Sequence, residues 1–296
     1  MDGILNINKS IGMTSQDVAT AIRRLLKQKR VGHAGTLDPL ASGVLPLCVG
    51  QATRVAEYLS ESGKAYEAVI VFGAVTDTYD TEGQVVRTGD ASSLTLEQIA
   101  GALPRFLGPQ MQRPPLYSAI KIQGQPAYKR VRAGQDITLE PRPITITRLT
   151  IIAWESPRLT LAVECGKGTY IRSLAFDLGE LLGCGAYLGG LVRTRSGPFT
   201  LADSITLEEC ADALSTNTLA AHIFPPDIAL RAYPAIMLDD PTTARVLHGM
   251  PFEAADDDSA DSTPTLARVY APDNRFIAIA EWDEERSLWQ PKKVFG

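Results

Sequence analysis

The sequence lacks any long apolar run. In its 296 residues, no segment approaches the roughly 18 consecutive apolar residues that mark a membrane-spanning helix. Residues 1–9 lack the charged start and long apolar stretch of a signal peptide. We therefore expect a cytoplasmic protein with no membrane segment.

The sequence also lacks a cysteine pattern. Its four cysteines have no C-x-x-C spacing, so neither a zinc site nor a disulfide framework is indicated. We expect Cys48, Cys165, Cys184 and Cys210 to be structural thiols, and we expect no metal and no cofactor.

Length and patterning indicate a mixed α/β (α+β) chain with one large and one small domain. At 45% hydrophobic residues, the chain can bury a sizeable core, and domains average roughly 150 residues. Alternation predicts strands, a period of 3.6 predicts helices, and glycine-rich or proline-rich stretches separate them. The expected strands are 3–8, 66–72, 143–155 and 158–166; the expected helices start at Thr14 or Ser15, Leu94, Thr169 and Ser204.

The C-terminal part differs in composition. Residues 253–265 form an acidic stretch that we expect to be a solvated loop. Three strands follow it, at residues 266–272, 276–282 and 287–295. A small β-rich domain is therefore predicted from about residue 229 to residue 296.

Charge is distributed unevenly along the chain. The net charge of −5 argues against a nucleic acid partner, but residues 1–200 carry 22 Lys/Arg and 17 Asp/Glu, whereas residues 201–296 carry 7 and 17. Between Arg105 and Arg148 there are 8 basic and 2 acidic residues, interleaved with Phe106, Tyr117 and Tyr128. Such a mixture can bind phosphates and stack bases, although it is also compatible with a solvated basic face.

Asp38 lies in the segment "GHAGTLDPLASG", which is too broken for a helix. An aspartate before proline is common in turns, yet the surrounding glycines allow close approach of a ligand and Pro39 fixes the chain. A metal role is disfavoured because His33 is the only neighbouring ligand type. Asp38 is thus a candidate nucleophile or base that needs a partner to keep it ionised.

Arg172, in "CGKGTYIRS", is the candidate partner. It is predicted to lie in the first turn of a helix after a tight glycine turn. An arginine beside a buried aspartate lowers its pKa by about 1 to 3 units, so we expect a lowered pKa for Asp38. The order "GKGT" does not match a phosphate-binding P-loop.

These segments resemble the bacterial tRNA pseudouridine-55 synthases, the TruB family. "GHAGTLDPLASGVLPLCVGQATR" is similar to the family signature, and four further blocks agree in order over most of residues 3–200. The blocks are "NKSIGMTS", "KAYEAVIVFGAVTDTYDTEG", "PPLYSAIKIQGQPAYKRVRAG" and "GKGTYIRSLAFDLGELLGCGAYLGGLVRTRSGPF".

The resemblance implies an isomerase that converts uridine 55 in the T loop of tRNA to pseudouridine. It implies that Asp38 is the nucleophile, that Tyr66 stacks on the base and assists removal of the C5 proton, and that Arg172 pairs with Asp38. It further implies a substrate-binding role for five residues: His33, which helps extrude the target, Tyr170 and Leu191, which line the uridine pocket, and Lys9 and Asp80.

The resemblance also implies the domain plan. Residues 1–228 would form the catalytic domain with an RNA-binding insertion, and residues 229–296 a PUA-like domain, in a chain that we expect to be a monomer. The family usually reads Asp-Lys-Pro near its start, where this chain has Asn8, Lys9 and Ser10. The N-terminal loop is therefore expected to be positioned differently.

Two other functions stay open from the residues alone. A nucleosidase or glycosidase could use Asp38, but it would need a second carboxylate about 5 to 10 Å away, and the sequence signals none. A non-catalytic RNA-binding module would keep the basic groove without the chemistry. Within the synthase reading, attack of Asp38 at C1′, a glycal route and addition to C6 are all compatible with the residues.

Overall fold

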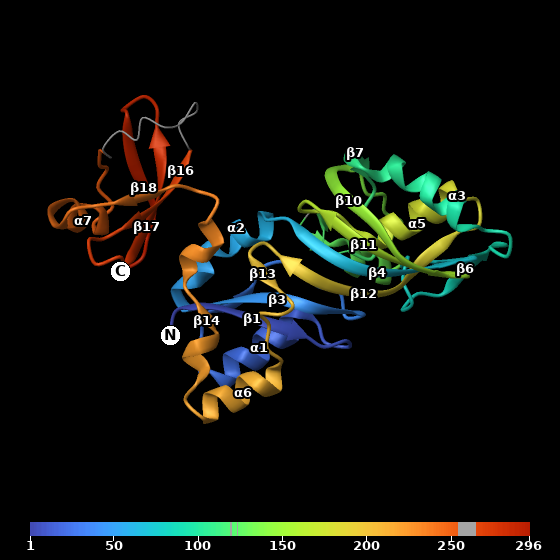
Figure 1. The fold of residues 1–296 in the computed structure, drawn as a ribbon, viewed down its shortest axis with the longest axis horizontal. Helices are drawn as coiled ribbons and strands as arrows, with labels where there is room; N and C mark the ends of the chain where they lie inside the picture. Colours follow the sequence, from blue (N-terminus) through green and yellow to red (C-terminus); the bar gives the residue numbers. More distant parts are fainter. Residues whose placement is uncertain (119, 123, 254–264) are drawn as a thin grey trace.

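The computed structural model describes residues 1–118, 120–122, 124–253 and 265–296. The side chains of residues 126, 128 and 132 are not described, so the stacking role considered for Tyr128 lies outside the described atoms. Residues 254–264, most of the acidic stretch predicted as a loop, also lie outside the described residues. The predicted mixed α/β class is confirmed (Figure 1).

A ten-stranded mixed sheet forms the larger part of the molecule. Strand β12 runs parallel to β3, while the other neighbours along the sheet are antiparallel. The strands in sheet order are β14 (Ile223–Phe224), β1 (Gly3–Lys9), β3 (Ala41–Val49), β12 (Ala186–Ser196), β4 (Lys64–Phe72), β11 (Arg158–Cys165), β10 (Arg142–Glu155) and β7 (Gly108–Gln112), with β2 (Val31–His33) paired to β3 and β13 (Phe199–Thr200) paired to β12.

Helices pack near the β1 edge and over the centre of this sheet. Thr14 is the N-cap of helix α1 (Ser15–Leu25), one of the two starts that the sequence predicts, and Asp17 completes a capping box with it. Helix α6 (Leu207–Ser215) contacts α1 and β1, whereas α5 (Ile171–Leu181) contacts β4 and β12 (Figure 1). The remaining elements of this part are α2 (Ala56–Glu61), α3 (Leu96–Ala102), α4 (Ala127–Arg132), β5 (Ala74–Thr76), β6 (Val85–Thr88), β8 (Lys121–Ile122), β9 (Gln125–Pro126), and the 3-10 turns η1 (Gly50–Val55), η2 (Leu103–Phe106), η3 (Leu219–His222) and η4 (Pro226–Leu230).

Strand β3 has a composition unlike that of a central strand. It contains a glycine and a proline, yet most of its residues are buried. Pro46 pairs with Asn6 of β1, while on the other side of β3 the partners β12 and β2 pair only with residues 41–43 and 47–49. Pro46 therefore lies where no strand requires its missing N–H on that side.

The C-terminal unit, residues 235–296, contains a second sheet of four strands. Its strands are β15 (Ala235–Met237), β16 (Leu266–Tyr270), β17 (Phe276–Asp283) and β18 (Leu288–Val294), accompanied by α7 (Asp240–Leu247). The last three strands were predicted from the sequence, and β15 was not. This unit lies beside α2 (Figure 1) and meets the rest of the chain at η1 and α2. Phe295 packs there in a cluster with Val55 and Phe199.

The four cysteines are all free and buried. Burial raises the pKa of Cys48 to about 12 and that of Cys165 to about 11. They are therefore protonated packing residues at neutral pH, as predicted. Within the described ranges, no helix is both long enough and apolar enough to span a membrane.

Candidate active site

Asp38 lies in the turn that leads into β3, and hydrogen bonds hold the backbone on both sides of it. The Ser15 hydroxyl accepts a hydrogen bond from Leu37 N at 2.7 Å and lies 3.0 Å from Leu37 O, to which it donates. Gly12 N donates to Pro39 O at 2.8 Å. The start of α1 therefore fixes the position from which the Asp38 side chain projects.

Arg172 lies in the first turn of α5, as predicted, and its side chain is buried. Its Nε lies 2.9 Å from Asp38 Oδ2. The Nε–H is not aligned for a hydrogen bond, so this contact is an ion pair. The guanidinium also donates to Thr78 O at 3.3 Å and to Tyr117 O at 3.1 Å. One side chain thus joins the Asp38 turn to two distant loops.

Asp80 is the second carboxylate of this cluster. Its Oδ2 lies 3.4 Å from Arg172 Nη1, and its Oδ1 accepts hydrogen bonds from the Thr78 hydroxyl at 2.6 Å and from Glu82 N at 3.0 Å. Its side chain is 3% exposed, compared with 35% for Asp38. The two carboxylates therefore differ: Asp80 is fully engaged, whereas Asp38 remains accessible to a ligand.

The predicted direction of the Asp38 pKa shift was wrong. Burial raises the pKa of Asp38, Arg172 lowers it, and the nearby Asp80 raises it again, with a net upward shift. The expectation from the sequence took account of the arginine alone. Depth of burial and a second carboxylate sharing the same guanidinium are three-dimensional properties, and here they outweigh it.

Tyr66 and Leu191 lie on the strands beside the Asp38 turn. Tyr66 is half-buried on β4, and Leu191 of β12 lies opposite Ala41 of β3 and Ala68 of β4. Burial raises the pKa of the Tyr66 hydroxyl, and the guanidinium of Arg193 opposes this shift. Tyr66 is therefore a neutral phenol at rest.

Tyr170 immediately precedes α5 and is held by one side chain. Gln112, the last residue of β7, accepts from Tyr170 N at 2.9 Å and donates to Tyr170 O at 3.0 Å. Burial raises the pKa of the half-buried Tyr170 hydroxyl, which is close enough to Arg172 and Asp38 for their charges to affect it. The edge strand thus positions a residue of the cluster.

Lys9 and His33 belong to the surroundings of the site. Lys9 is 1% exposed and donates to Ser10 O at 3.0 Å and to Met13 O at 2.7 Å. Burial lowers the pKa of Lys9 to about 8, although Asp38 opposes this. His33 ends β2, and its buried Nδ1 has no hydrogen-bond partner among the residues that the structure describes. Burial lowers its pKa, so it is neutral near pH 7.

Two residues near the site were missed in the sequence. Arg193 of β12 is 1% exposed and donates to carbonyls of the Asp38 segment. Tyr79 adopts a φ of +63°, unusual for a residue with a side chain. Its ring stacks on Phe176 of α5 with centroids 4.1 Å apart. The segment "LVRTRS" shows two arginines, but no strand was predicted there, and the inward orientation of Arg193 could not be deduced from it.

The basic stretch Arg105 to Arg148 begins in η2 and ends in β10, and its part between β7 and β10 includes α4, β8 and β9. It reaches the site through Tyr117 O and through Arg113 O, which accepts from Ser173 of α5 at 2.8 Å. Both contacts are to the first turn of α5. The segment predicted to bind RNA is therefore attached to the element that carries Arg172.

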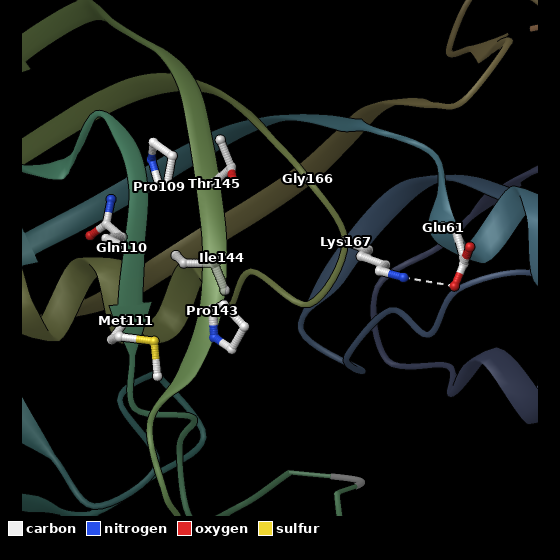
Figure 2. Close-up of a pocket in the computed structure, with 9 residues that line it drawn as sticks. All are labelled: Glu61, Pro109, Gln110, Met111, Pro143, Ile144, Thr145, Gly166 and Lys167. Atoms are coloured by element: carbon white, nitrogen blue, oxygen red, sulfur yellow. Dashed lines mark hydrogen bonds and ion pairs between the residues drawn. The ribbon is translucent and has the colours of Figure 1, made fainter. Parts of the chain in front are cut away.

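A hollow of about 580 Å³ lies at the β7 edge of the sheet, away from Asp38. Residues of β7 and β10 line one side, and Lys167 and Glu61 form an ion pair of 2.7 Å on the other (Figure 2). None of the predicted site residues lines it. The hollow adjoins the loop before α5, but it does not contain the charged cluster.

The cluster has no arrangement suited to a metal. Among the described residues, no group of three or more His, Cys, Asp and Glu side chains could hold an ion. Asp38 and Asp80 instead share one guanidinium. The chemistry that these residues can supply is that of a carboxylate beside an arginine and a phenol.

Sequence comparisons agree over most of the chain. Residues 23–171 match the model described as "TruB family pseudouridylate synthase (N terminal domain)", and residues 172–231 match "tRNA pseudouridylate synthase B C-terminal domain". The chain is 43% identical over 295 residues to tRNA pseudouridine synthase B of Dehalococcoides mccartyi, covering 100% of this chain and 97% of that one. It is 49% identical over 253 residues to the protein of the same name from Symbiobacterium thermophilum, covering 84% and 83%.

Solved structures share the fold. A chain in the crystal structure of a Cbf5-Nop10-Gar1 complex superposes with a TM-score of 0.76 at 26% identity, covering 99% of this chain and 85% of that one. A chain of the archaeal box H/ACA sRNP Nop10-Cbf5 complex gives 0.75 at 25% identity, with 99% and 86% covered. The resemblance first read from the "LDPLASG" segment is confirmed, since the family models and the full-length relatives show that the chain belongs to the TruB family of pseudouridylate synthases.

Proposed function

We propose that this enzyme converts uridine 55 in the T loop of tRNA to pseudouridine, with Asp38 as the nucleophile. Membership of the pseudouridylate synthase family supports the isomerase class. The names of the relatives support a tRNA substrate. The choice of position 55 and the residue roles rest on the resemblance of the Asp38, Tyr66 and Arg172 segments to the family's motifs.

The observation that carries the proposal is the asymmetry between the two carboxylates. Arg172 contacts both, but Asp80 is fully engaged by its neighbours and Asp38 keeps 35% of its side chain exposed. A nucleophile must reach its substrate, whereas a carboxylate that fixes an arginine need not. We therefore assign the chemistry to Asp38 and the orientation of Arg172 to Asp80.

The reaction is an isomerisation that balances without a co-reactant. The N1–C1′ bond breaks, the uracil rotates, a C5–C1′ bond forms, C5 loses its proton and N1 gains one. Asp38 acts by attack at C1′, by promoting a glycal, or by addition to C6; each route divides one difficult step into easier ones. Tyr66 stacks on the base and is placed to assist removal of the C5 proton.

The substrate must be extruded from the folded T loop before it reaches Asp38. Extrusion costs a few kcal/mol, which stacking on an aromatic ring and a filled pocket can offset. We assign stacking to Tyr66, the pocket walls to Tyr170 and Leu191, and extrusion to His33. The basic segment between β7 and β10 supplies phosphate contacts.

We further propose that residues 1–228 act as the catalytic domain, that residues 229–296 form a PUA-like domain, and that the enzyme is a cytoplasmic monomer.

A hydrolytic function receives little support from this geometry. The sequence signalled no second carboxylate, yet the structure places Asp80 beside Asp38. A glycosidase pair needs one carboxyl group free to act on water or on the leaving group. Asp80 is 3% exposed and both of its oxygens are engaged, so it cannot take that part.

The test is a T stem-loop RNA tritiated at uridine C5. Tritium release into water without free uracil supports the synthase. Release of free uracil would indicate a hydrolase, and binding with neither product would indicate a non-catalytic RNA-binding module. A second RNA carries its only labelled uridine at a loop position other than 55. This RNA should release no tritium if position 55 is the target.

A further inference from the structure

Arg193 is buried at the point where β12 meets β3 and β4. It is 1% exposed and among the largest fully buried side chains of the protein. In the sheet it lies opposite Gly43 of β3 and Tyr66 of β4. Its side chain therefore starts between the segment that carries Asp38 and the strand that carries Tyr66.

The guanidinium of Arg193 binds three carbonyls of the segment around Asp38. Nε donates to Val44 O at 2.6 Å, Nη1 to Thr36 O at 3.3 Å, and Nη2 to Gly35 O at 3.1 Å. Thr36 and Gly35 precede Asp38, and Val44 follows it. The turn that presents the carboxylate is thus held at both ends by one rigid fork.

Among the described residues, Arg193 lacks the carboxylate partner that a buried cation normally has. In the part of the chain that the structure describes, it takes part in no ion pair, while Arg172 takes part in two. An unpaired buried charge is costly unless hydrogen bonds stabilise it. Here carbonyl oxygens accept the hydrogen bonds of the guanidinium. Burial lowers the pKa of Arg193, and the nearby Tyr66 hydroxyl opposes this shift.

The backbone around Arg193 is adapted to this close approach. Gly43 has a φ of +100°, and a Cβ placed on it would lie 2.3 Å from Arg193 O. Any side chain at position 43 would therefore separate the two strands. A glycine in a buried strand usually marks such a contact between backbones.

We propose that Arg193 is a positioning residue for the isomerisation, which holds the Asp38 turn in register with Tyr66. This inference rests on the proposed function and deepens it. Asp38 must meet one face of the nucleotide while Tyr66 meets the base, so their relative placement decides whether both act on the same uridine. Arg193 is the side chain that touches the Asp38 segment from the strand between them.

Arg193→Lys is the informative variant. A lysine keeps the charge but replaces a planar fork with a single ammonium group, which cannot hold three divergent carbonyls in the same way. Misplacement of a catalytic group by about 1 Å costs on the order of 100-fold in rate. We expect kcat for pseudouridine formation to fall by about that factor, while KM and the Kd for the stem-loop RNA change by less than about threefold.

Arg195→Lys is the matched control, since Arg195 lies two residues further along β12 and is half-exposed beside Glu164. It should leave kcat unchanged. Amide exchange should quicken at residues 35–44 in Arg193→Lys and not in Arg195→Lys. In the double variant Arg193→Lys/Tyr66→Phe, kcat should fall by less than the product of the two single-variant factors, because both changes disturb the same placement of Asp38 relative to Tyr66.

The wild-type enzyme is assayed first on the same RNA. A wild-type enzyme that makes no pseudouridine would contradict the proposed function. An active wild type with an Arg193→Lys variant of normal kcat would overturn the positioning role alone. The positioning role would also be overturned if Arg193→Lys no longer unfolded cooperatively. The same holds if the kcat factors of Arg193→Lys and Tyr66→Phe simply multiplied in the double variant. Either result would assign Arg193 to general stability.

Discussion

Charged side chains are buried at the centre of the large sheet, whereas the C-terminal unit keeps its charges at the surface. The buried charged residues that the structure describes all lie in the first part of the chain: Lys9, Lys64, Asp80, Arg172 and Arg193. In the C-terminal unit the described core is apolar, and its internal ion pairs, such as Lys292 with Glu281, are exposed.

This difference separates two purposes of charge in one chain. Burying a charge is costly, so buried charges that gather around one accessible carboxylate, as Lys9, Asp80 and Arg172 do around Asp38, indicate a site. Exposed pairs contribute little to stability and mainly keep the surface soluble. Substitutions of matched type in the two regions should therefore have very different consequences.

Asp38→Asn should have the largest effect. The amide keeps the size of the side chain but cannot act as a nucleophile, so kcat should fall by more than about 10³-fold. Tritium release from C5-labelled RNA measures this, and RNA binding should persist because phosphate contacts do not involve Asp38. Asp273→Asn, in an exposed turn of the C-terminal unit, should leave kcat unchanged. Full activity of Asp38→Asn would refute the assignment of the nucleophile.

Arg172→Lys should have the next largest effect. The lysine loses the simultaneous contacts with Asp38, Asp80 and two carbonyls, and removal of one fixed polar group at a reacting centre costs about 10²-fold or more in kcat. The matched change is Arg268→Lys in the C-terminal unit, where the arginine donates to Tyr233 O at 3.0 Å. There we expect unchanged kcat and a loss of about 1 kcal/mol in the free energy of unfolding. Equal falls in kcat in Arg172→Lys and Arg268→Lys would contradict the proposed difference between the two regions.

A change of pH should alter kcat less than these two substitutions do, through the ionisation of Asp38 and Lys9. Asp38 must be ionised, and its pKa is raised, so activity should fall on the acid side at a pH above the ordinary aspartate value. Lys9 has a pKa of about 8 and faces Asp38, Arg193, Glu82 and Asp17. Loss of its charge above pH 8 removes a cation near Asp38, and kcat should fall by about tenfold or less.

Lys9→Met should abolish the alkaline fall in the pH–rate profile. Lys64 is the matched control, since its pKa is also lowered by burial to about 8. It donates to the carbonyls of Ser60 and Ser62 at the end of α2 rather than to the Asp38 turn. An alkaline fall that survives in Lys9→Met and disappears in Lys64→Met would transfer the effect to the other lysine.

Local patterns in the sequence were sufficient to predict much of the fold. The start of the first helix at Thr14 or Ser15, the helical period after Thr169 and the three alternating C-terminal strands were all predicted correctly. Strand β3 was read as part of a broken, glycine-rich loop. Its proline is tolerated because of which strands flank it, and that arrangement is a property of the whole sheet.

The site was predictable where a motif names a residue and less so where packing decides. Arg193 and Arg195 alternate in the sequence as if they shared a face, but the pairing of β12 with β4 shifts register between them. One arginine is consequently buried and the other is half-exposed. The predicted direction of the Asp38 pKa shift was wrong for a similar reason, because elements far apart in the chain determine how deeply Asp38 is buried.

Lys292→Gln should have the smallest effect. Lys292 pairs with Glu281 at 3.1 Å across β17 and β18, and both side chains are about half exposed, at 44% and 50%. Solvent screens such a pair, so the free energy of unfolding should fall by less than about 1 kcal/mol, and this loss should shrink further in high salt. Chemical denaturation at low and high ionic strength measures both quantities. A loss of several kcal/mol would mean that surface charge stabilises the C-terminal unit as strongly as its apolar core does, and the contrast between the two regions would then hold for catalysis only.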